Sequence, residues 1–178
     1  MQKLLRNYFD FTNKNVVILG GSKGIGLTIT KKLIDLGATV IIVSRTKPNL
    51  NVVFYKCDFE NLQEVKEVAK KIKKDYKKNW AIVNALAITI PSNEKIQLPE
   101  IFEKIINVNL VNHYYFISGM VSTVEVGGSI LNISSIYGDL AFPGNPSYSS
   151  SKSGLNGLTR SLSYDLSKKK IRVNSLSA

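Results

Sequence analysis

Residues 15–26 read NVVILGGSKGIG, in which the apolar run 16–19 passes directly into the glycine-rich turn 20–26. The stretch that follows, 25–36, has the apolar spacing of an amphipathic helix. Glycines in such a turn let the backbone approach a pyrophosphate, and the helix directs its positive end at the phosphates. The order of strand, glycine turn and helix therefore predicts a phosphate-binding loop, with a purely structural turn as the alternative.

Short apolar runs recur along the chain and alternate with segments of helical spacing. Strands are expected at 39–43, 52–56, 81–85, in the run 130–133 that ends in two serines, and at 171–176; helices are expected at 62–78, 99–123 and 148–167. This alternation predicts an α/β fold, a parallel sheet wound on both faces, as a single domain over residues 1–178. Right-handed crossovers and a glycine loop after the first strand imply the strand order 3-2-1-4-5-6.

A second informative stretch is residues 127–152, GGSILNISSIYGDLAFPGNPSYSSSK. Its strand delivers Ser135 to the edge of a cavity, whereas two-residue alternation turns Ser134 to the other side. Tyr148 and Lys152 are four residues apart and so share one face of a helix. A nearby ammonium group favours phenolate over phenol and makes the tyrosine a usable acid or base. Taken alone, such a pair more often lies on a solvated helix face.

These motifs together resemble the short-chain dehydrogenase/reductase family, which has a Rossmann-like sheet. The resemblance implies an NADP(H)-dependent oxidoreductase that reduces a carbonyl to an alcohol, or the reverse, on a small-molecule substrate. It makes Tyr148 the proton donor, Lys152 the residue that activates Tyr148 and holds the nicotinamide ribose, and Ser135 the group that orients the carbonyl. Asn109, in NVNL, matches the family's fourth active-site position, where an asparagine kinks its helix and binds a relay water. An ordinary helix irregularity is the alternative for Asn109.

The resemblance also implies a set of cofactor contacts. The glycines match the family's TGxxxGIG, although Leu19 replaces the threonine, and Asn84 begins NALA where the family has NNAG. The residues implied in cofactor binding are Gly20, Ser22, Lys23, Gly24, Ile25, Gly26, Arg45, Asp58, Asn84, Tyr148 and Lys152.

Cofactor choice is predicted from the residues after the second strand. An acidic residue there favours NAD and an arginine favours NADP. Residues 44–46 contain Arg45 and no acid, and Lys23 lies in the glycine loop, so NADP(H) is expected over NAD(H). Two ordinary surface cations are the alternative. For Asp58, the resemblance implies a contact with the adenine amino group, and N-capping of the helix near Leu62 is the alternative.

Composition excludes several other classes of function. The net charge is +11, but the lysines of residues 62–78 fall largely outside the apolar stripe, which predicts a solvated helix face and no nucleic-acid partner. Met1–Asn13 lacks an apolar signal region and no run is long enough to span a membrane, so a cytoplasmic protein is expected. Cys57 is the only cysteine, which excludes an internal disulfide and a cysteine metal cluster, and no metal is expected. His113, the only histidine, is interpreted as a packing or interface residue.

The family normally continues, beyond the position of Ala178, through a substrate-covering helical segment and a seventh strand. Two hypotheses follow: an NADP(H)-dependent carbonyl reductase, and a truncated, non-catalytic nucleotide-binding or interaction protein. The resemblance also implies a homodimer formed through the helices that contain Asn109 and Tyr148. Residues expected to be available for that contact are His113, Tyr114, Tyr115, Gly154 and Gly157.

Overall fold

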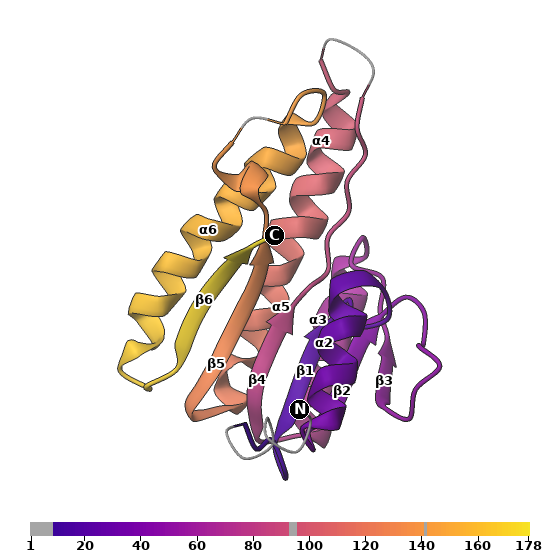
Figure 1. Ribbon diagram of the computed structural model, residues 1–178. Coiled ribbons are helices and arrows are strands. Elements are labelled where there is room, and N and C mark those ends of the chain that lie inside the picture. Colours follow the sequence, from indigo (N-terminus) through magenta and orange to yellow (C-terminus); the bar gives the residue numbers. More distant parts are fainter. Residues whose placement is uncertain (1–8, 93–95, 141) are drawn as a thin grey trace.

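The computed structural model describes residues 9–92, 96–140 and 142–178, so most of Met1–Asn13, where no signal region was expected, lies outside the described residues. One sheet of six parallel strands has the order β3-β2-β1-β4-β5-β6, which confirms the predicted topology (Figure 1). The strands are β1 (Asn15–Leu19), β2 (Thr39–Ser44), β3 (Val53–Lys56), β4 (Asn79–Asn84), β5 (Val124–Ser134) and β6 (Arg172–Ser177).

Helices cover the two faces of this sheet. They are α2 (Gly24–Asp35), α3 (Leu62–Asp75), α4 (Pro99–Ile106), α5 (Asn112–Met120) and α6 (Pro146–Ser167), with short turns η1 (Asn107–Val111), η2 (Val121–Thr123) and η3 (Ile136–Gly138). Helix α2 packs on one face of the sheet, and α3, α5 and α6 contribute to the apolar core on the other (Figure 1). The sheet is therefore wound on both faces, as the alternating pattern predicted.

The central strands explain why the apolar runs are continuous and do not alternate. All four residues from Val16 to Leu19 are fully buried. Val16 and Ile18 belong to the core under α2, whereas Val17 and Leu19 belong to the core under α3 and α5. A parallel strand that is buried on both faces needs apolar side chains at every position.

The segment predicted as one long helix over 99–123 is interrupted in its middle. Helix α4 passes into the π-helical turn η1, which contains Asn109, and then into α5. π-turns inside helices are rare and occur often at functional sites. The helix irregularity at Asn109 is thus a change of helix type.

Surface and core residues follow the composition argument. The lysines between residues 62 and 78 are exposed, as predicted. Cys57 is fully buried, and burial raises the pKa of its thiol to about 12. In the part of the chain that the structure describes, no helix is long and apolar enough to cross a membrane.

Candidate active site

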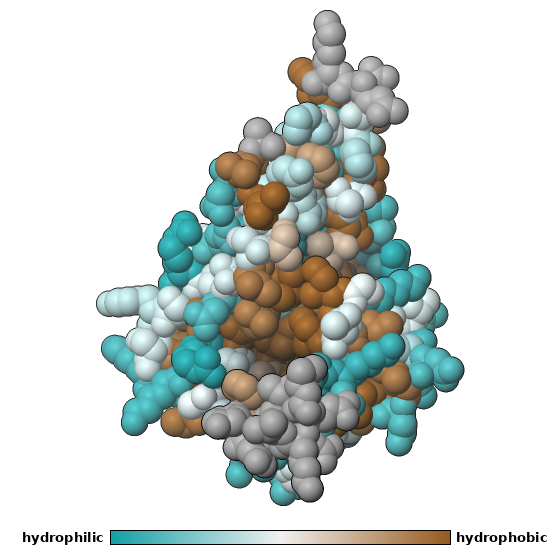
Figure 2. Space-filling model, in the orientation of Figure 1, coloured by the Kyte–Doolittle hydropathy of each residue, from teal (hydrophilic) through white to brown (hydrophobic). Residues whose placement is uncertain are grey.

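A cavity of about 620 Å³ lies at the carboxyl ends of the strands, beside the point where the strand order reverses between β1 and β4. Ligands of open α/β sheets bind at such a point. In the orientation of Figure 1, apolar residues gather in a hollow over the ends of β4 and β5, between hydrophilic flanks (Figure 2). The cavity is lined by seven of the predicted cofactor residues: Gly20, Ser22, Lys23, Gly24, Ile25, Arg45 and Asp58.

The glycine loop is closely packed except on its cavity side. A Cβ atom on Gly26 would lie 2.2 Å from the main-chain oxygen of Gly20, and one on Gly20 would lie 2.8 Å from Cα of Leu86. Gly24 lines the cavity, has a positive φ of 51°, and offers open space where a Cβ atom would stand. Because helix α2 begins at Gly24, a phosphate there would meet its positive end. The loop therefore fits a pyrophosphate.

Another hydroxyl group ties this loop in place although Leu19 replaces the family's threonine. The buried Thr30 Oγ1 donates a hydrogen bond of 3.1 Å to the main-chain oxygen of Gly21. The Gly20 N–H donates to the main-chain oxygen of Val43 at 2.9 Å, which fixes the loop to β2. Thr30 was not identified from the sequence, where it is one polar residue within an amphipathic helix.

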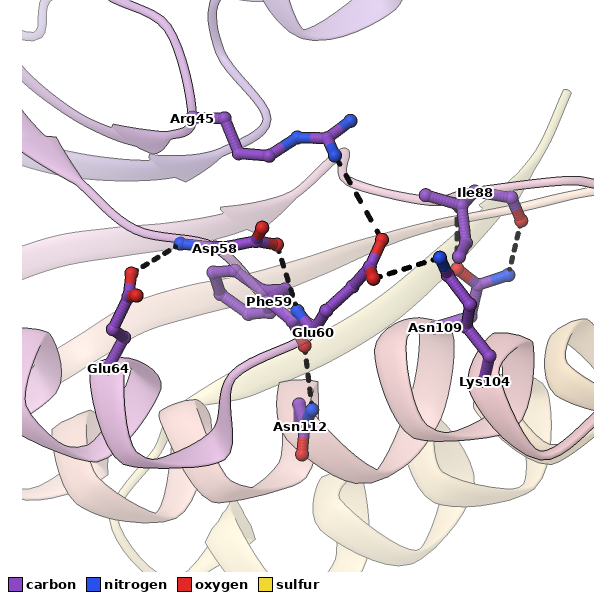
Figure 3. A network of polar contacts seen from close by, with 9 residues as sticks. All are labelled: Arg45, Asp58, Phe59, Glu60, Glu64, Ile88, Lys104, Asn109 and Asn112. Atoms are coloured by element: carbon purple, nitrogen blue, oxygen red, sulfur yellow. Dashed lines mark hydrogen bonds and ion pairs between the residues drawn. The ribbon is translucent and has the colours of Figure 1, made fainter. Parts of the chain in front are cut away.

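Asp58 lies in the loop between β3 and α3, and the alternative that it caps α3 is wrong. The N-cap is Asn61, whose side chain accepts hydrogen bonds from the N–H groups of Gln63 and Glu64. Asp58 Oδ1 instead accepts from the Glu60 N–H at 3.0 Å (Figure 3). The Asp58 carboxylate therefore braces its own loop at the edge of the cavity.

An acidic residue that sequence reasoning missed lies next to Arg45. Glu60 also lines the cavity, and its Oε1 lies 4.0 Å from Nη1 of Arg45. Its Oε2 lies 2.9 Å from Nζ of Lys104, on α4 (Figure 3). No signal in the sequence marks these contacts, because Arg45 and Glu60 meet only when β2 and β3 lie side by side.

Asn109 is fully buried and links the wall of the cavity to helix α6. Its side chain accepts a hydrogen bond from the Ile88 N–H at 2.8 Å and donates to the Ile88 main-chain oxygen at 2.9 Å. It also donates to Ser151 Oγ at 3.1 Å, and Ser151 in turn donates to the main-chain oxygen of Tyr148 at 2.7 Å. Ile88 lines the cavity. The side-chain amide of Asn109 therefore connects the wall of the cavity to the turn of α6 that carries Tyr148.

Lys152 lies one turn after Tyr148 on α6, with its ammonium group over the Tyr148 ring. Its Nζ is 5.6 Å from the centre of the Tyr148 ring and donates a hydrogen bond of 2.8 Å to the main-chain oxygen of Ile133. The lysine is 3% exposed, and burial lowers the pKa of its ammonium group to about 8. The Tyr148 ring is half-buried and meets Phe142 edge-on. Neither Tyr148 nor Lys152 lines the 620 Å³ cavity.

The two serines after β5 have different partners. Ser134 is turned toward α6, where its Oγ donates to the main-chain oxygen of Lys152 at 3.4 Å. Ser135 caps η3: its Oγ accepts from the Tyr137 N–H at 3.3 Å and donates to the main-chain oxygen of Ala178 at 3.4 Å. Ser135 is 5% exposed, and these two bonds hold its hydroxyl at the start of η3.

His113 is a packing residue, and the expectation that it is available at an interface is wrong because it is fully buried. Its ring packs against Phe59, and Nδ1 lies 2.7 Å from the main-chain oxygen of Asn109 and 3.0 Å from Nδ2 of Asn84. Burial lowers the pKa of His113 to about 3, so the ring is neutral. Asn84 itself points into this buried network and does not line the cavity.

Gly154 serves a contact within the chain. A Cβ atom there would lie 2.6 Å from Cδ2 of Leu110, so the glycine lets α6 approach η1 closely. This packing within the chain accounts for the glycine at this position. Among the described residues, no group of three His, Cys, Asp or Glu side chains is placed to hold a metal ion.

Comparison with known proteins agrees with this geometry. The family model described as short chain dehydrogenase matches residues 14–178. The chain belongs to the short-chain dehydrogenase family. It is 34% identical over 175 residues to a 3-oxoacyl-[acyl-carrier-protein] reductase FabG of Rickettsia felis, covering 94% of this chain and 72% of that protein. It is 31% identical over 169 residues to carbonyl reductase family member 4 of Danio rerio, covering 89% and 71%.

Solved structures of this family share the fold. A short chain dehydrogenase family protein from Francisella tularensis superposes with a TM-score of 0.85 at 30% identity, over 92% of this chain and 68% of that one. The chain thus spans about 72% of the length of the Rickettsia relative and 68% of the Francisella structure. As a short-chain dehydrogenase it is an oxidoreductase, which the sequence motifs predicted.

Proposed function

We propose that this short-chain dehydrogenase is an NADP(H)-dependent carbonyl reductase, with Tyr148 as the proton donor. The arrangement of Lys152 and Tyr148 carries the proposal: a buried ammonium group lies 5.6 Å from the centre of the phenol ring. This cation lies beside the phenol that would give up its proton to the carbonyl oxygen. Relatives named as a 3-oxoacyl-[acyl-carrier-protein] reductase and a carbonyl reductase support a carbonyl as the substrate group.

The residues of this chain have distinct roles in the proposed reaction. The bound nicotinamide supplies the hydride. Tyr148 protonates the carbonyl oxygen, Ser135 orients that oxygen, and Lys152 stabilises the tyrosine after proton loss. Asn109 holds the turn of Tyr148 through Ser151. The glycine loop holds the pyrophosphate, with Gly24 facing it.

NADP(H) is proposed as the preferred cofactor because Arg45 and Lys23 both line the cavity and no acid adjoins Arg45 in sequence. Arg45→Asp should weaken NADPH far more than NADH, by about 1.5 to 3 kcal/mol for a lost charged hydrogen bond. Titration of both cofactors into both proteins measures this. Equal weakening of NADPH and NADH would contradict the preference.

The substrate class is tested by following the oxidation of NADPH with a panel of ketones and 3-oxoacyl thioesters. Turnover of at least one carbonyl compound is expected. Tight binding of NADPH without turnover of any compound in the panel would indicate a cofactor-binding protein and contradict the proposed reaction.

A homodimer formed through the helices that contain Asn109 and Tyr148 is proposed from exposed aromatic side chains. Tyr114 on α5 is 48% exposed and Tyr164 on α6 is 82% exposed. A self-complementary patch closes after two copies. Tyr114→Glu should shift the dimer toward monomer in sedimentation velocity. A tetramer, or a dimer unaffected by this change, would show that another surface is used.

A further inference from the structure

The loop that carries Glu60 is held firmly beside the cavity (Figure 3). Asn112, on α5, donates a hydrogen bond of 2.7 Å to the main-chain oxygen of Phe59. The Glu60 N–H donates to Asp58 Oδ1, and the Asp58 N–H donates to Glu64 Oε2, each at 3.0 Å. These bonds fix the backbone at and just before Glu60, which lines the cavity.

In that region the carboxylate is shared unequally between two cations. Lys104 Nζ lies 2.9 Å from Oε2, whereas Arg45 Nη1 lies 4.0 Å from Oε1. The Arg45 side chain is 62% exposed, so the guanidinium remains available to a second anion. Because Arg45 and Glu60 both line the cavity, an anion bound to Arg45 there would be a neighbour of the Glu60 carboxylate.

We propose that Glu60 determines how strongly Arg45 holds the 2′-phosphate of the cofactor, and that Lys104 acts through Glu60. This rests on the proposed preference for NADP(H). The Glu60 carboxylate competes for the Arg45 guanidinium and repels a phosphate dianion, so it weakens the binding of NADP(H). Lys104 offsets that charge and so favours the phosphate. Lys104 belongs to α4, which leads into the π-turn of Asn109, so the helix of the active site also influences the adenosine end of the cofactor.

Binding of two adenosine fragments tests this without any turnover. Adenosine 2′,5′-bisphosphate carries the 2′-phosphate and adenosine 5′-monophosphate lacks it. In calorimetry at low salt, Lys104→Met should weaken the binding of the bisphosphate by about two- to fivefold. This factor corresponds to the free energy that an exposed ion pair contributes. Glu60→Gln should tighten the bisphosphate by about the same factor. The affinity for the monophosphate should change by less than about 1.5-fold in both variants, since this fragment lacks the 2′-phosphate.

The double variant Glu60→Gln/Lys104→Met separates an indirect role of Lys104 from a direct one. If Lys104 acts through Glu60, the double variant binds the bisphosphate as Glu60→Gln does. If Lys104→Met weakens the bisphosphate equally in both backgrounds, Lys104 binds the phosphate itself and the relay is wrong. If Glu60→Gln weakens the monophosphate, Glu60 binds the ribose hydroxyls and the proposal is overturned.

Matched variants control for net charge. Glu103→Gln removes the same charge next to Lys104, and Lys70→Met removes a lysine from the exposed face of α3. Both should leave the ratio of the two fragment affinities unchanged. Equal effects of Glu60→Gln and Glu103→Gln on this ratio would show that Glu60 acts only through the net charge of the protein. That result would contradict the proposal.

Arg45→Ala distinguishes failure here from failure of the proposed cofactor preference. If Arg45→Ala abolishes the tighter binding of the bisphosphate relative to the monophosphate, while the Glu60 and Lys104 variants behave as the controls do, only the role of Glu60 is wrong. If Arg45→Ala leaves that tighter binding intact, the preference assigned to Arg45 is itself wrong.

Discussion

Lys152 Nζ lies 5.6 Å from the centre of the Tyr148 ring and is held there by a hydrogen bond to a main-chain oxygen of β5. Helical spacing places both side chains on one face of α6, and the end of β5 fixes the lysine. The ammonium group is thus buried beside the phenol ring, with little access to water.

Burial of Lys152 should make stability depend on pH in a defined window. The pKa of its ammonium falls from 10.5 to about 8, so between these values the unfolded chain binds a proton that the folded chain has released. The free energy of unfolding therefore rises with pH across this window, and below it the folded chain bears the full penalty of a buried charge. Lys152→Met should accordingly stabilise the fold more at about pH 7 than at about pH 10.5, by roughly 2 to 3 kcal/mol, because a tenfold change in proton affinity corresponds to about 1.4 kcal/mol.

Urea unfolding of both proteins at the two pH values measures this difference. Lys74→Met, which removes an exposed lysine of α3, serves as the control and should show no such pH dependence. An identical stability difference for Lys152→Met at both pH values would mean that the lysine is not desolvated.

Asn109→Ala should destabilise the fold by about 1 to 3 kcal/mol, because it leaves partly buried backbone groups of Ile88 without a partner. Asn107→Ala is the matched control in the same π-turn, since the Asn107 side chain makes no hydrogen bond to the described residues; it should cost less than about 0.5 kcal/mol. Denaturant titration compares the two. Equal losses would show that the bonds to Ile88 contribute little.

Gly24→Ala and Gly26→Ala should fail in different ways. An added methyl group on Gly26 meets the Gly20 carbonyl. That variant should therefore lose about 1 to 3 kcal/mol of stability or more. A methyl group on Gly24 meets open space, so the fold should lose only about 1 to 2 kcal/mol from its left-handed backbone. It should nevertheless weaken the binding of NADPH, because Gly24 lines the cavity. Unweakened NADPH binding by a folded Gly24→Ala protein would place the pyrophosphate elsewhere.

The sequence predicted those features that depend on local spacing. The runs Val16–Leu19 and Thr39–Val43 predicted strands because central parallel strands need apolar side chains on both faces. The spacing of Tyr148 and Lys152 predicted a shared helix face, which the structure confirms. The start of β5 at Val124 was missed, since residues 124–129 contain two glycines and its pairing with β4 is irregular there.

Features that depend on the packing of separate segments were not predictable in this way. Glu60 approaches Arg45 only through the pairing of β2 with β3, and Lys104 reaches Glu60 from a third element. The choice of Asn61 over Asp58 as N-cap depends on where the first turn of α3 starts, and both residue types suit that role. Likewise, the bond between Asn109 and Ile88 joins a π-turn to a loop, and no sequence periodicity encodes it.

The role of Tyr148 as proton donor is tested by the rate at which Tyr148→Phe reduces a carbonyl substrate of the wild-type protein, measured by oxidation of NADPH. The change removes one oxygen atom and leaves the ring, so NADPH affinity should stay within a few-fold of wild type. Turnover should fall by at least about 100-fold, the lower range for the loss of a general acid. A Tyr148→Phe protein that binds NADPH and turns over at the wild-type rate would contradict the account, because the proton would then come from another group.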